Sequence, residues 1–138
     1  MKDFSYFPGC SLHGTSREFD ESIRGVMDCL GTKLHELEDW TCCGSTSAHC
    51  LDENLAVQMS ARNLAIAEKS DRDLLVPCAS CYSRFKAAEY EVKEHGKKVD
   101  FPYKGDVAIR FALDYLSDKA VMEEVKKRMV KPLDGLKA

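Results

Sequence analysis

The chain has 138 residues, 44% of them hydrophobic and 31% charged, which is enough for one domain with its own core. Its 20 basic and 23 acidic side chains give a formal net charge of −3, so nothing indicates the basic surface typical of nucleic-acid binding. No apolar run approaches the ~20 residues of a membrane-spanning helix, and the N-terminus lacks the apolar stretch of a secretion signal.

The first half of the chain predicts two strands and two helices. Residues 4–8 are rich in aromatic side chains and stop at a Pro-Gly turn, which indicates a strand. From Thr15 the apolar spacing is helical, and the expected inward residues are Phe19, Ile23, Val26 and Leu30. Residues 33–38 alternate polar and apolar side chains, as a second strand does. A second helix is expected from about Asp52 to Lys69, and its expected inner face consists of Leu55, Met59 and Ile66.

The second half predicts a third strand at residues 73–77, a helix at about 80–95 and further helical segments from Asp106 onward. The order β-α-β-α-β-α favours a parallel sheet with right-handed crossovers. The expected fold class is therefore α/β, with a small parallel sheet of three to four strands, flanking helices in two or three layers and C-terminal helices. Residues 1–131 are expected to form a single domain, and residues 132–138 a linker.

The chain has seven cysteines, and an odd number in a chain that is not a small secreted peptide argues against a closed disulfide framework. In the cytoplasm, where we expect this protein, clustered thiols indicate metal ligation or redox chemistry. Five of the seven directly follow predicted strands, namely Cys10, Cys42, Cys43, Cys78 and Cys81. Because the carboxyl ends of parallel strands share one edge of a sheet, these five are expected to converge.

The chemistry of five thiols favours a polynuclear metal centre. Thiolates are soft ligands that suit iron–sulfur clusters and zinc. The Cys78-x-x-Cys81 motif alone is also compatible with a thioredoxin-like redox pair, but such a pair does not need the other three cysteines. A single zinc ion takes four ligands and would leave one of the five unused. Gly9 and Gly44 are expected to let the backbone approach the sulfurs closely.

The remaining candidate residues have simpler interpretations. Cys29 lies beside the apolar stripe of the first helix, so a buried structural cysteine is expected, and Cys50 is expected to be a packed loop residue. His13 follows Cys10 by three residues and is a possible ligand or proton donor, although an exposed or helix-capping histidine is favoured. Trp40 is expected either to shield a metal centre from water or to pack in the core.

With these residues identified, the chain resembles the cysteine-rich CCG domain family, which includes the B subunit of heterodisulfide reductase. The resemblance spans about residues 4–130 and rests on the five cysteines, on Gly44 and on the segments 6–11 and 76–82. It implies a non-cubane [4Fe–4S] cluster as cofactor, with zinc as the alternative. The ligands implied by the resemblance are Cys10, Cys42, Cys43, Cys78 and Cys81.

The same resemblance implies a function. The chain is expected to be an iron–sulfur redox module of an oxidoreductase similar to the heterodisulfide reductase B subunit, passing electrons toward a disulfide, a quinone or another acceptor. Expected partners are an iron–sulfur donor protein similar to the C subunit of heterodisulfide reductase and a flavoprotein subunit. The expected substrate is a disulfide of the coenzyme M–coenzyme B type. The alternative is a zinc-binding structural domain that assembles redox subunits without transferring electrons.

Two further expectations concern completeness and location. Proteins of this type usually carry two CCG modules, so the chain is expected to be an N-terminal module that is not a competent enzyme alone. It is expected in the cytoplasm or peripheral to a membrane complex. No catalytic residue follows from the sequence.

Overall fold

A four-stranded parallel sheet lies at the centre of the computed structural model, which describes residues 2–135. The strands are β1 (Phe4–Tyr6), β2 (Leu34–Glu36), β3 (Leu74–Val76) and β4 (Ile109–Phe111). They are arranged in the order β2-β1-β3-β4, and each neighbouring pair is parallel. The expected α/β class is confirmed. The chain first moves outward from β1 to β2 and then crosses back to β3, so the direction of strand addition reverses between β1 and β3.

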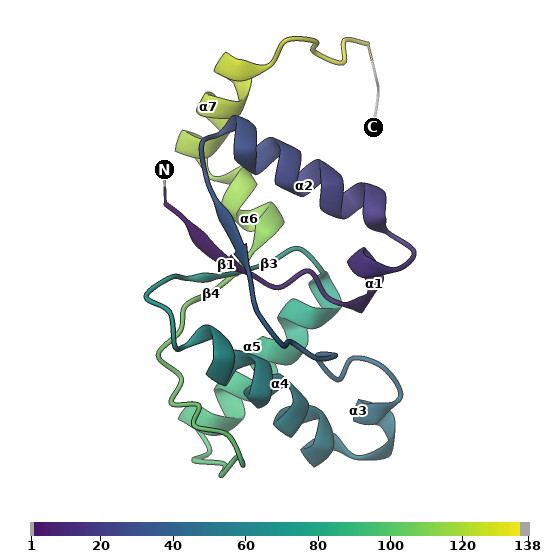
Figure 1. Ribbon diagram of the computed structural model, residues 1–138, viewed down its shortest axis with the longest axis vertical. Coiled ribbons are helices and arrows are strands. Elements are labelled where there is room, and N and C mark those ends of the chain that lie inside the picture. Colours follow the sequence, from purple (N-terminus) through teal and green to yellow (C-terminus); the bar gives the residue numbers. More distant parts are fainter. Residues whose placement is uncertain (1, 136–138) are drawn as a thin grey trace.

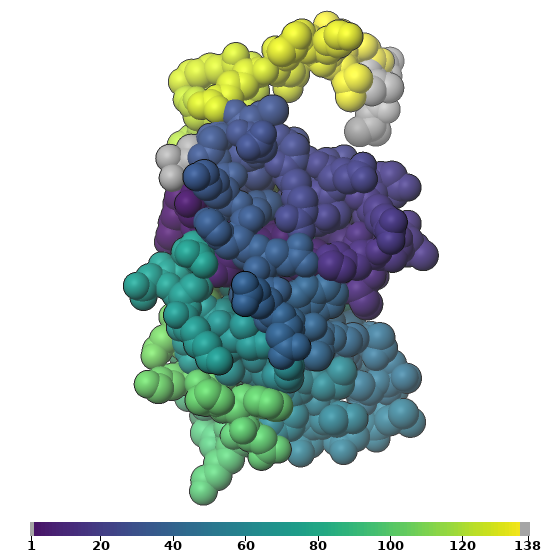
Figure 2. All heavy atoms as spheres, in the orientation of Figure 1, coloured from purple at the N-terminus to yellow at the C-terminus, as the bar shows by residue number. Residues whose placement is uncertain are grey.

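Helices cover both faces of the sheet and give three layers (Figure 1). One layer contains α2 (Arg17–Cys29), α6 (Ala112–Ser117) and α7 (Lys119–Arg128). The opposite layer contains α4 (Glu53–Ala67) and α5 (Ala79–Lys93). Two short helices, α1 (Cys10–His13) and α3 (Ala48–Leu51), lie in the connections after β1 and β2. Figure 2 shows the two helical layers at opposite ends of the molecule.

Each face of the sheet has its own apolar core, because successive residues of a strand point to opposite sides. The central strand β3 illustrates this: Leu75 packs on the α2 side, whereas Leu74 and Val76 pack on the α4 and α5 side. The α2 side contains Phe4, Tyr6, Ile23, Met27, Leu30, Leu75, Ala112 and Val121. All residues of β1 and β3 are buried, as expected for central strands of a parallel sheet that is covered on both faces.

Helix α4 buries a different face from the one expected. Leu55 is 48% exposed and Met59 is only half-buried, whereas Ile66 is half-buried and packs against the core, so the expected inner face is wrong for two of its three residues. The buried residues of α4 are Ala56, Val57, Ser60, Ala61, Asn63, Leu64, Ala65 and Ala67. Most of them are small, which lets the helix approach its neighbours closely, and a prediction weighted toward large apolar side chains misses such a face.

Helix α2 and the C-terminal region also differ from expectation. Ile23 and Leu30 are buried as predicted, but Phe19 and Val26 are partly exposed and Met27 is buried instead. Within the segment expected to be helical, residues 109–111 form β4, and α6 begins directly after it. The spacing of apolar residues around this short strand fits a helix as well, which explains the error.

The expected linker, residues 132–138, falls partly outside the described residues. Residues 132–135 form neither helix nor strand, and residues 136–138 are not described. Among residues 2–135, no helix combines the length and the apolar character needed to cross a bilayer.

The corrected face of α4 is tested by two substitutions of the same type. Leu64 is fully buried, so Leu64→Ala should lower the free energy of unfolding by about 2–5 kcal/mol. Leu55 is largely exposed, so Leu55→Ala should change it by only about 0.5 kcal/mol. Urea denaturation of both variants measures the difference, and equal losses would contradict the assigned face.

Candidate metal centre

Three connections that carry cysteines leave the sheet at the same edge, the carboxyl ends of the strands. Cys10 is the first residue of α1 after β1, and Cys42 and Cys43 lie between β2 and α3. Cys78 is the N-cap of α5 after β3, and Cys81 lies in the first turn of that helix. In Figure 1, α1 and α3 lie together on the right-hand side of the molecule. The connections after β1 and β3 flank the point where the strand order reverses, where open α/β sheets bind their ligands.

Four of the five motif cysteines lie close together, and the sulfurs of two of them are in contact. Cys43 and Cys81 are buried, and their Sγ atoms lie 3.2 Å apart. Cys42, next to Cys43, and Cys78, three residues before Cys81, are near enough to affect the pKa values of these two thiols. In the described part of the chain, the Cys10 thiol is exposed and takes no part in these sulfur contacts. Of the five cysteines expected to converge, Cys43 and Cys81 thus have their sulfurs in contact, Cys42 and Cys78 lie near them, and Cys10 lies at the same edge of the sheet without a sulfur contact.

The two buried thiols do not ionise independently. The hydrogen bond between Cys43 and Cys81 lowers the pKa of Cys43 to about 6, and backbone N–H groups of Ser45 and Cys43 add to the effect. The same hydrogen bond and burial raise the pKa of Cys81. The pair therefore loses a first proton readily and retains the second, because the remaining proton is shared between two close sulfurs.

Two glycines allow this close approach. Gly9 has a φ of 80°, and a Cβ atom at this position would lie 3.0 Å from the Sγ of Cys81. Gly44 has a φ of 89°, and a Cβ atom there would lie 3.1 Å from the Cα of Ala56 in α4. The backbone N–H of Gly44 also donates to the Sγ of Cys42 over 3.5 Å. Both positions were expected to favour glycine, and side chains would displace the sulfur-bearing loops.

Polar residues of α4 hold the loop that carries Cys42 and Cys43. The side chain of Asn63 is fully buried and makes a paired contact with the backbone of Thr41. It accepts from the Thr41 N–H over 2.9 Å and donates to the Thr41 carbonyl over 2.8 Å. The hydroxyl of Ser60 donates to the Cys43 carbonyl over 2.8 Å. Sequence reasoning missed both residues, although polar residues on the alanine-rich side of a helix were an available signal.

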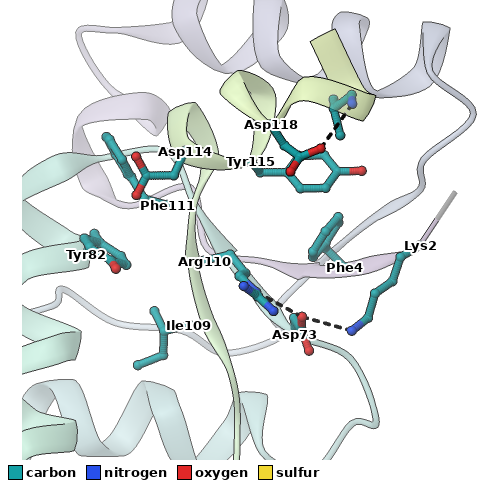
Figure 3. A pocket seen from close by; sticks show the side chains of 11 residues that line it. Lys2, Phe4, Asp73, Tyr82, Ile109, Arg110, Phe111, Asp114, Tyr115 and Asp118 are labelled. Carbon is teal, nitrogen blue, oxygen red and sulfur yellow. Dashed lines mark hydrogen bonds and ion pairs between the residues drawn. The ribbon is translucent and has the colours of Figure 1, made fainter. Parts of the chain in front are cut away.

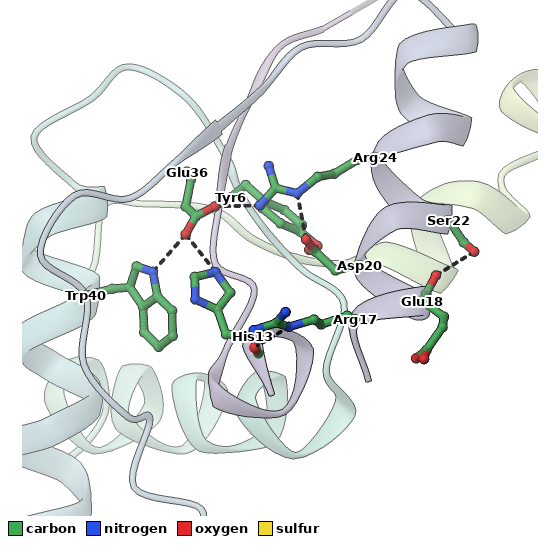
Figure 4. Close-up of polar contacts among 9 residues, drawn as sticks. All are labelled: Tyr6, His13, Arg17, Glu18, Asp20, Ser22, Arg24, Glu36 and Trp40. Carbon is green, nitrogen blue, oxygen red and sulfur yellow. Dashed lines mark hydrogen bonds and ion pairs between the residues drawn. The ribbon is translucent and has the colours of Figure 1, made fainter. Parts of the chain in front are cut away.

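A second anchor is the carboxylate of Glu36 at the end of β2 (Figure 4). It accepts from Trp40 Nε1 over 3.1 Å and pairs with His13 Nε2 over 3.0 Å. Its other oxygen pairs with Arg24 of α2 over 2.5 Å. The Glu36 carboxylate thereby links three parts of the molecule. These are α1, which begins at Cys10, the loop that leads to Cys42, and helix α2.

This network decides the role of two candidate residues. His13 is exposed, in line with the favoured prediction of an exposed or helix-capping histidine. Its ring pairs with the carboxylate of Glu36 and not with a sulfur. Trp40 is half-buried and packs edge-on against Phe7 and His13.

A separate polar contact lies on the α2 side of the sheet. The Tyr6 hydroxyl donates to Asp20 over 2.7 Å. Burial together with this hydrogen bond raises the pKa of Tyr6.

The donor set fits a thiophilic metal after a small adjustment. Among residues 2–135, no three His, Cys, Asp or Glu side chains are spaced as a finished ligand cage. The Sγ atoms of Cys43 and Cys81 lie 3.2 Å apart, whereas thiolates that share one tetrahedral ion at about 2.3 Å have sulfurs roughly 3.8 Å apart. To hold an ion, these two side chains would move apart slightly and the neighbouring cysteines would turn toward the same point. The soft sulfur donors of this group suit zinc or iron.

The two cysteines outside the motif are not buried, contrary to expectation. Cys29 is exposed near the end of α2, because that helix turns a different face toward the sheet. Cys50 is exposed on the short helix α3 and does not pack in a loop.

A hollow of about 410 Å³ at the β4 edge is a separate feature (Figure 3). Its lining contains no cysteine, and four of its five charged residues make structural contacts. Asp73 pairs with Lys2 over 2.9 Å and with Arg110 over 3.3 Å, and Asp118 caps α7. The hollow therefore does not form part of the cysteine site.

Comparisons with known proteins agree with this geometry. The family model described as a cysteine-rich domain, CCG, matches residues 4–86, which is more than half of the chain. The chain is 34% identical over 145 residues to the 8-methylmenaquinol:fumarate reductase membrane anchor subunit of Wolinella succinogenes, an alignment that covers 99% of this chain and 50% of the relative.

Two archaeal proteins are also similar. The chain is 25% identical to a protein of Archaeoglobus profundus described as similar to the heterodisulfide reductase B subunit, covering 99% of this chain and 49% of the relative. It is 23% identical to the B subunit of the ferredoxin/F420H2-dependent CoB-CoM heterodisulfide reductase of Methanosarcina acetivorans, covering 97% and 48%. The chain thus spans about half the length of the curated relatives it matches.

The close approach at Gly9 is tested against a second glycine. Gly9→Ala should lower the free energy of unfolding by about 1–3 kcal/mol, because the new Cβ requires a strained backbone and meets the Cys81 sulfur. Gly25 lies within α2 with nothing within 4 Å of its Cβ position, so Gly25→Ala should raise it by about 0.5–1 kcal/mol. Urea denaturation of the reduced, metal-free chain measures both, and a Gly9→Ala variant as stable as wild type would contradict the assignment.

Proposed function

The chain belongs to the cysteine-rich CCG domain family, and from this membership we propose that it is an iron–sulfur redox module of an oxidoreductase similar to the heterodisulfide reductase B subunit. The proposed cofactor is a non-cubane [4Fe–4S] cluster. Its proposed ligands are Cys10, Cys42, Cys43, Cys78 and Cys81, within a single domain of residues 1–131.

The observation that carries the proposal is the contact between the buried sulfurs of Cys43 and Cys81, with Cys42 and Cys78 beside them. Sulfurs from the loop after β2 and from the N-terminal end of α5 converge where α/β sheets bind ligands. The readily lost proton of the Cys43–Cys81 pair favours a thiolate, which is the form that binds metal. Burial of this pair also keeps water away, and exclusion of water is one of the factors that set a cluster's potential.

The protein's own residues would hold and isolate the group. Cys78 and Cys81 lie at the N-terminal end of α5, where the helix dipole favours negative charge. The Gly44 N–H donates to the Cys42 sulfur, and such hydrogen bonds tune the potential of a cluster. When bound, an iron–sulfur cluster supplies one-electron transfer. The exposed Cys10 lies on the side of the site that faces solvent, where an electron donor or acceptor could approach.

Partners and substrate follow as parts of the same proposal. The relatives are named as subunits of reductases, so we propose an iron–sulfur donor subunit and a flavoprotein subunit as partners in a complex. The proposed terminal acceptor is a disulfide of the coenzyme M–coenzyme B type or a quinone. We also propose a location in the cytoplasm or at the periphery of a membrane complex, and the relative that is named a membrane anchor subunit supports the second of these.

One observation favours the alternative, a zinc-binding structural domain. Four of the motif cysteines, Cys42, Cys43, Cys78 and Cys81, lie near the Cys43–Cys81 contact, and four is the number of ligands that a tetrahedral zinc site takes, whereas the Cys10 thiol is exposed and stands apart. Under this alternative the domain assembles redox subunits without transferring electrons.

Metal analysis of anaerobically purified protein tests the ligand assignment. We expect about four irons and four sulfides per chain. Cys43→Ser and Cys81→Ser should each abolish cluster assembly, whereas Cys29→Ser, at an exposed thiol outside the site, should leave it intact. Far-ultraviolet circular dichroism confirms that the variants fold, and equal iron content in all three would contradict the assignment.

Cys10→Ser separates the two metals. If five cysteines hold a cluster, this variant should lose at least half of its iron and sulfide. If four sulfurs hold zinc, both wild type and Cys10→Ser should carry one zinc per chain, with no visible iron–sulfur absorbance. Zinc and iron are measured together in each sample, so the second outcome would overturn the redox proposal.

A further inference from the structure

A second sulfur site lies outside the five motif cysteines, on the short helix α3. The Sγ of Cys50 lies 3.6 Å from Nε2 of His49, which is within hydrogen-bond reach for sulfur. Both residues are exposed. We propose that the His49–Cys50 pair is a reactive thiol site that forms a mixed disulfide with small disulfides. This goes beyond the metal centre and does not depend on it.

The orientation of the imidazole supports this role. Nδ1 of His49 lies 2.7 Å from the carbonyl oxygen of Thr46. A carbonyl only accepts hydrogen bonds, so Nδ1 carries a proton, and in the neutral imidazole Nε2 then presents a lone pair. That lone pair faces the Cys50 thiol. A nucleophile within reach of a base, with the base oriented by a third group, is the arrangement that activates cysteine nucleophiles.

His49 differs from the other histidines in pairing with a thiol. The other three histidines each pair with a carboxylate: His13 with Glu36, His35 with Asp3 and His95 with Glu91. The nearest following acid, Asp52, uses its carboxylate to cap α4 by accepting from the N–H groups of residues 54 and 55. The imidazole of His49 therefore remains available to the Cys50 thiol.

Access and chemistry point to a disulfide as the co-reactant. The thiol is exposed, and the next residue, Leu51, is 83% exposed and offers apolar surface for the group carried by the disulfide. The thiol proton passes to Nε2, and the thiolate attacks one sulfur of the disulfide. A bond forms between Cys50 and that sulfur as the original S–S bond breaks. The imidazolium returns its proton to the leaving thiolate, so the products are a mixed disulfide and one free thiol.

The chain contains a matched control. Cys29 is also exposed and lies outside the motif, but in the described part of the chain no histidine pairs with its thiol. Both thiols are exposed, so a small reagent can reach either of them. The rates of Cys50 and Cys29 can therefore be compared within one molecule.

The test treats anaerobically purified chain with dipyridyl disulfide at one neutral pH and follows each site by peptide mass spectrometry. We expect Cys50 to react roughly tenfold or more faster than Cys29. His49→Gln should bring the Cys50 rate down to that of Cys29 and leave Cys29 unchanged. Equal rates at the two sites in wild type, or an unchanged Cys50 rate in His49→Gln, would overturn the proposal. Metal content, measured in the same samples, reports separately on the proposed redox module.

Discussion

The sulfur of Cys81 occupies the point where three connections of the sheet meet. The Sγ of Cys43 lies 3.2 Å away, Cys78 lies at the N-cap of the same helix, and a Cβ atom added at Gly9 would lie 3.0 Å from the sulfur. This crowding follows from the parallel sheet, which delivers the ends of β1, β2 and β3 to one edge. The candidate site depends on this one packed position more than on any other.

Polar side chains from two elements, α4 and β2, hold the loops at that edge without contacting the sulfurs. Asn63 fixes the backbone of Thr41 just before the vicinal cysteines, and Ser60 fixes the carbonyl of Cys43. Glu36 holds α1 through His13 and the same loop through Trp40. Outer residues that orient ligands reduce the rearrangement a metal must impose. Both short cysteine-bearing segments are thus held by side chains from regular elements.

The sequence predicted which loops meet at the edge of the sheet better than it predicted which faces of the helices are buried. Cysteines that follow successive strands must converge if the sheet is parallel, and that requires only the order of the elements. Which face a helix buries depends on close packing, and α4 buries alanines while Leu55 stays exposed. The place of Asn63 on the alanine-rich side of α4 was a signal of a buried polar contact, but periodicity does not identify its partner, which is a backbone group of a loop. The sequence also could not predict that the Cys10 sulfur lies apart from the others, because the direction of a side chain depends on the folded backbone around it.

The seven cysteines include two chemical environments that the fold keeps apart. Cys43 and Cys81 are buried against each other, so their shared proton and restricted access favour a metal over a free disulfide as the partner. Cys50 is exposed and faces an oriented imidazole, which favours attack on a partner that arrives from solvent. The two environments favour a thiolate in different ways. At Cys43 a neighbouring thiol stabilises the thiolate, and at Cys50 an imidazole can accept the proton. A chain that uses both can bind a metal at the sheet edge and still expose a reactive sulfur on α3.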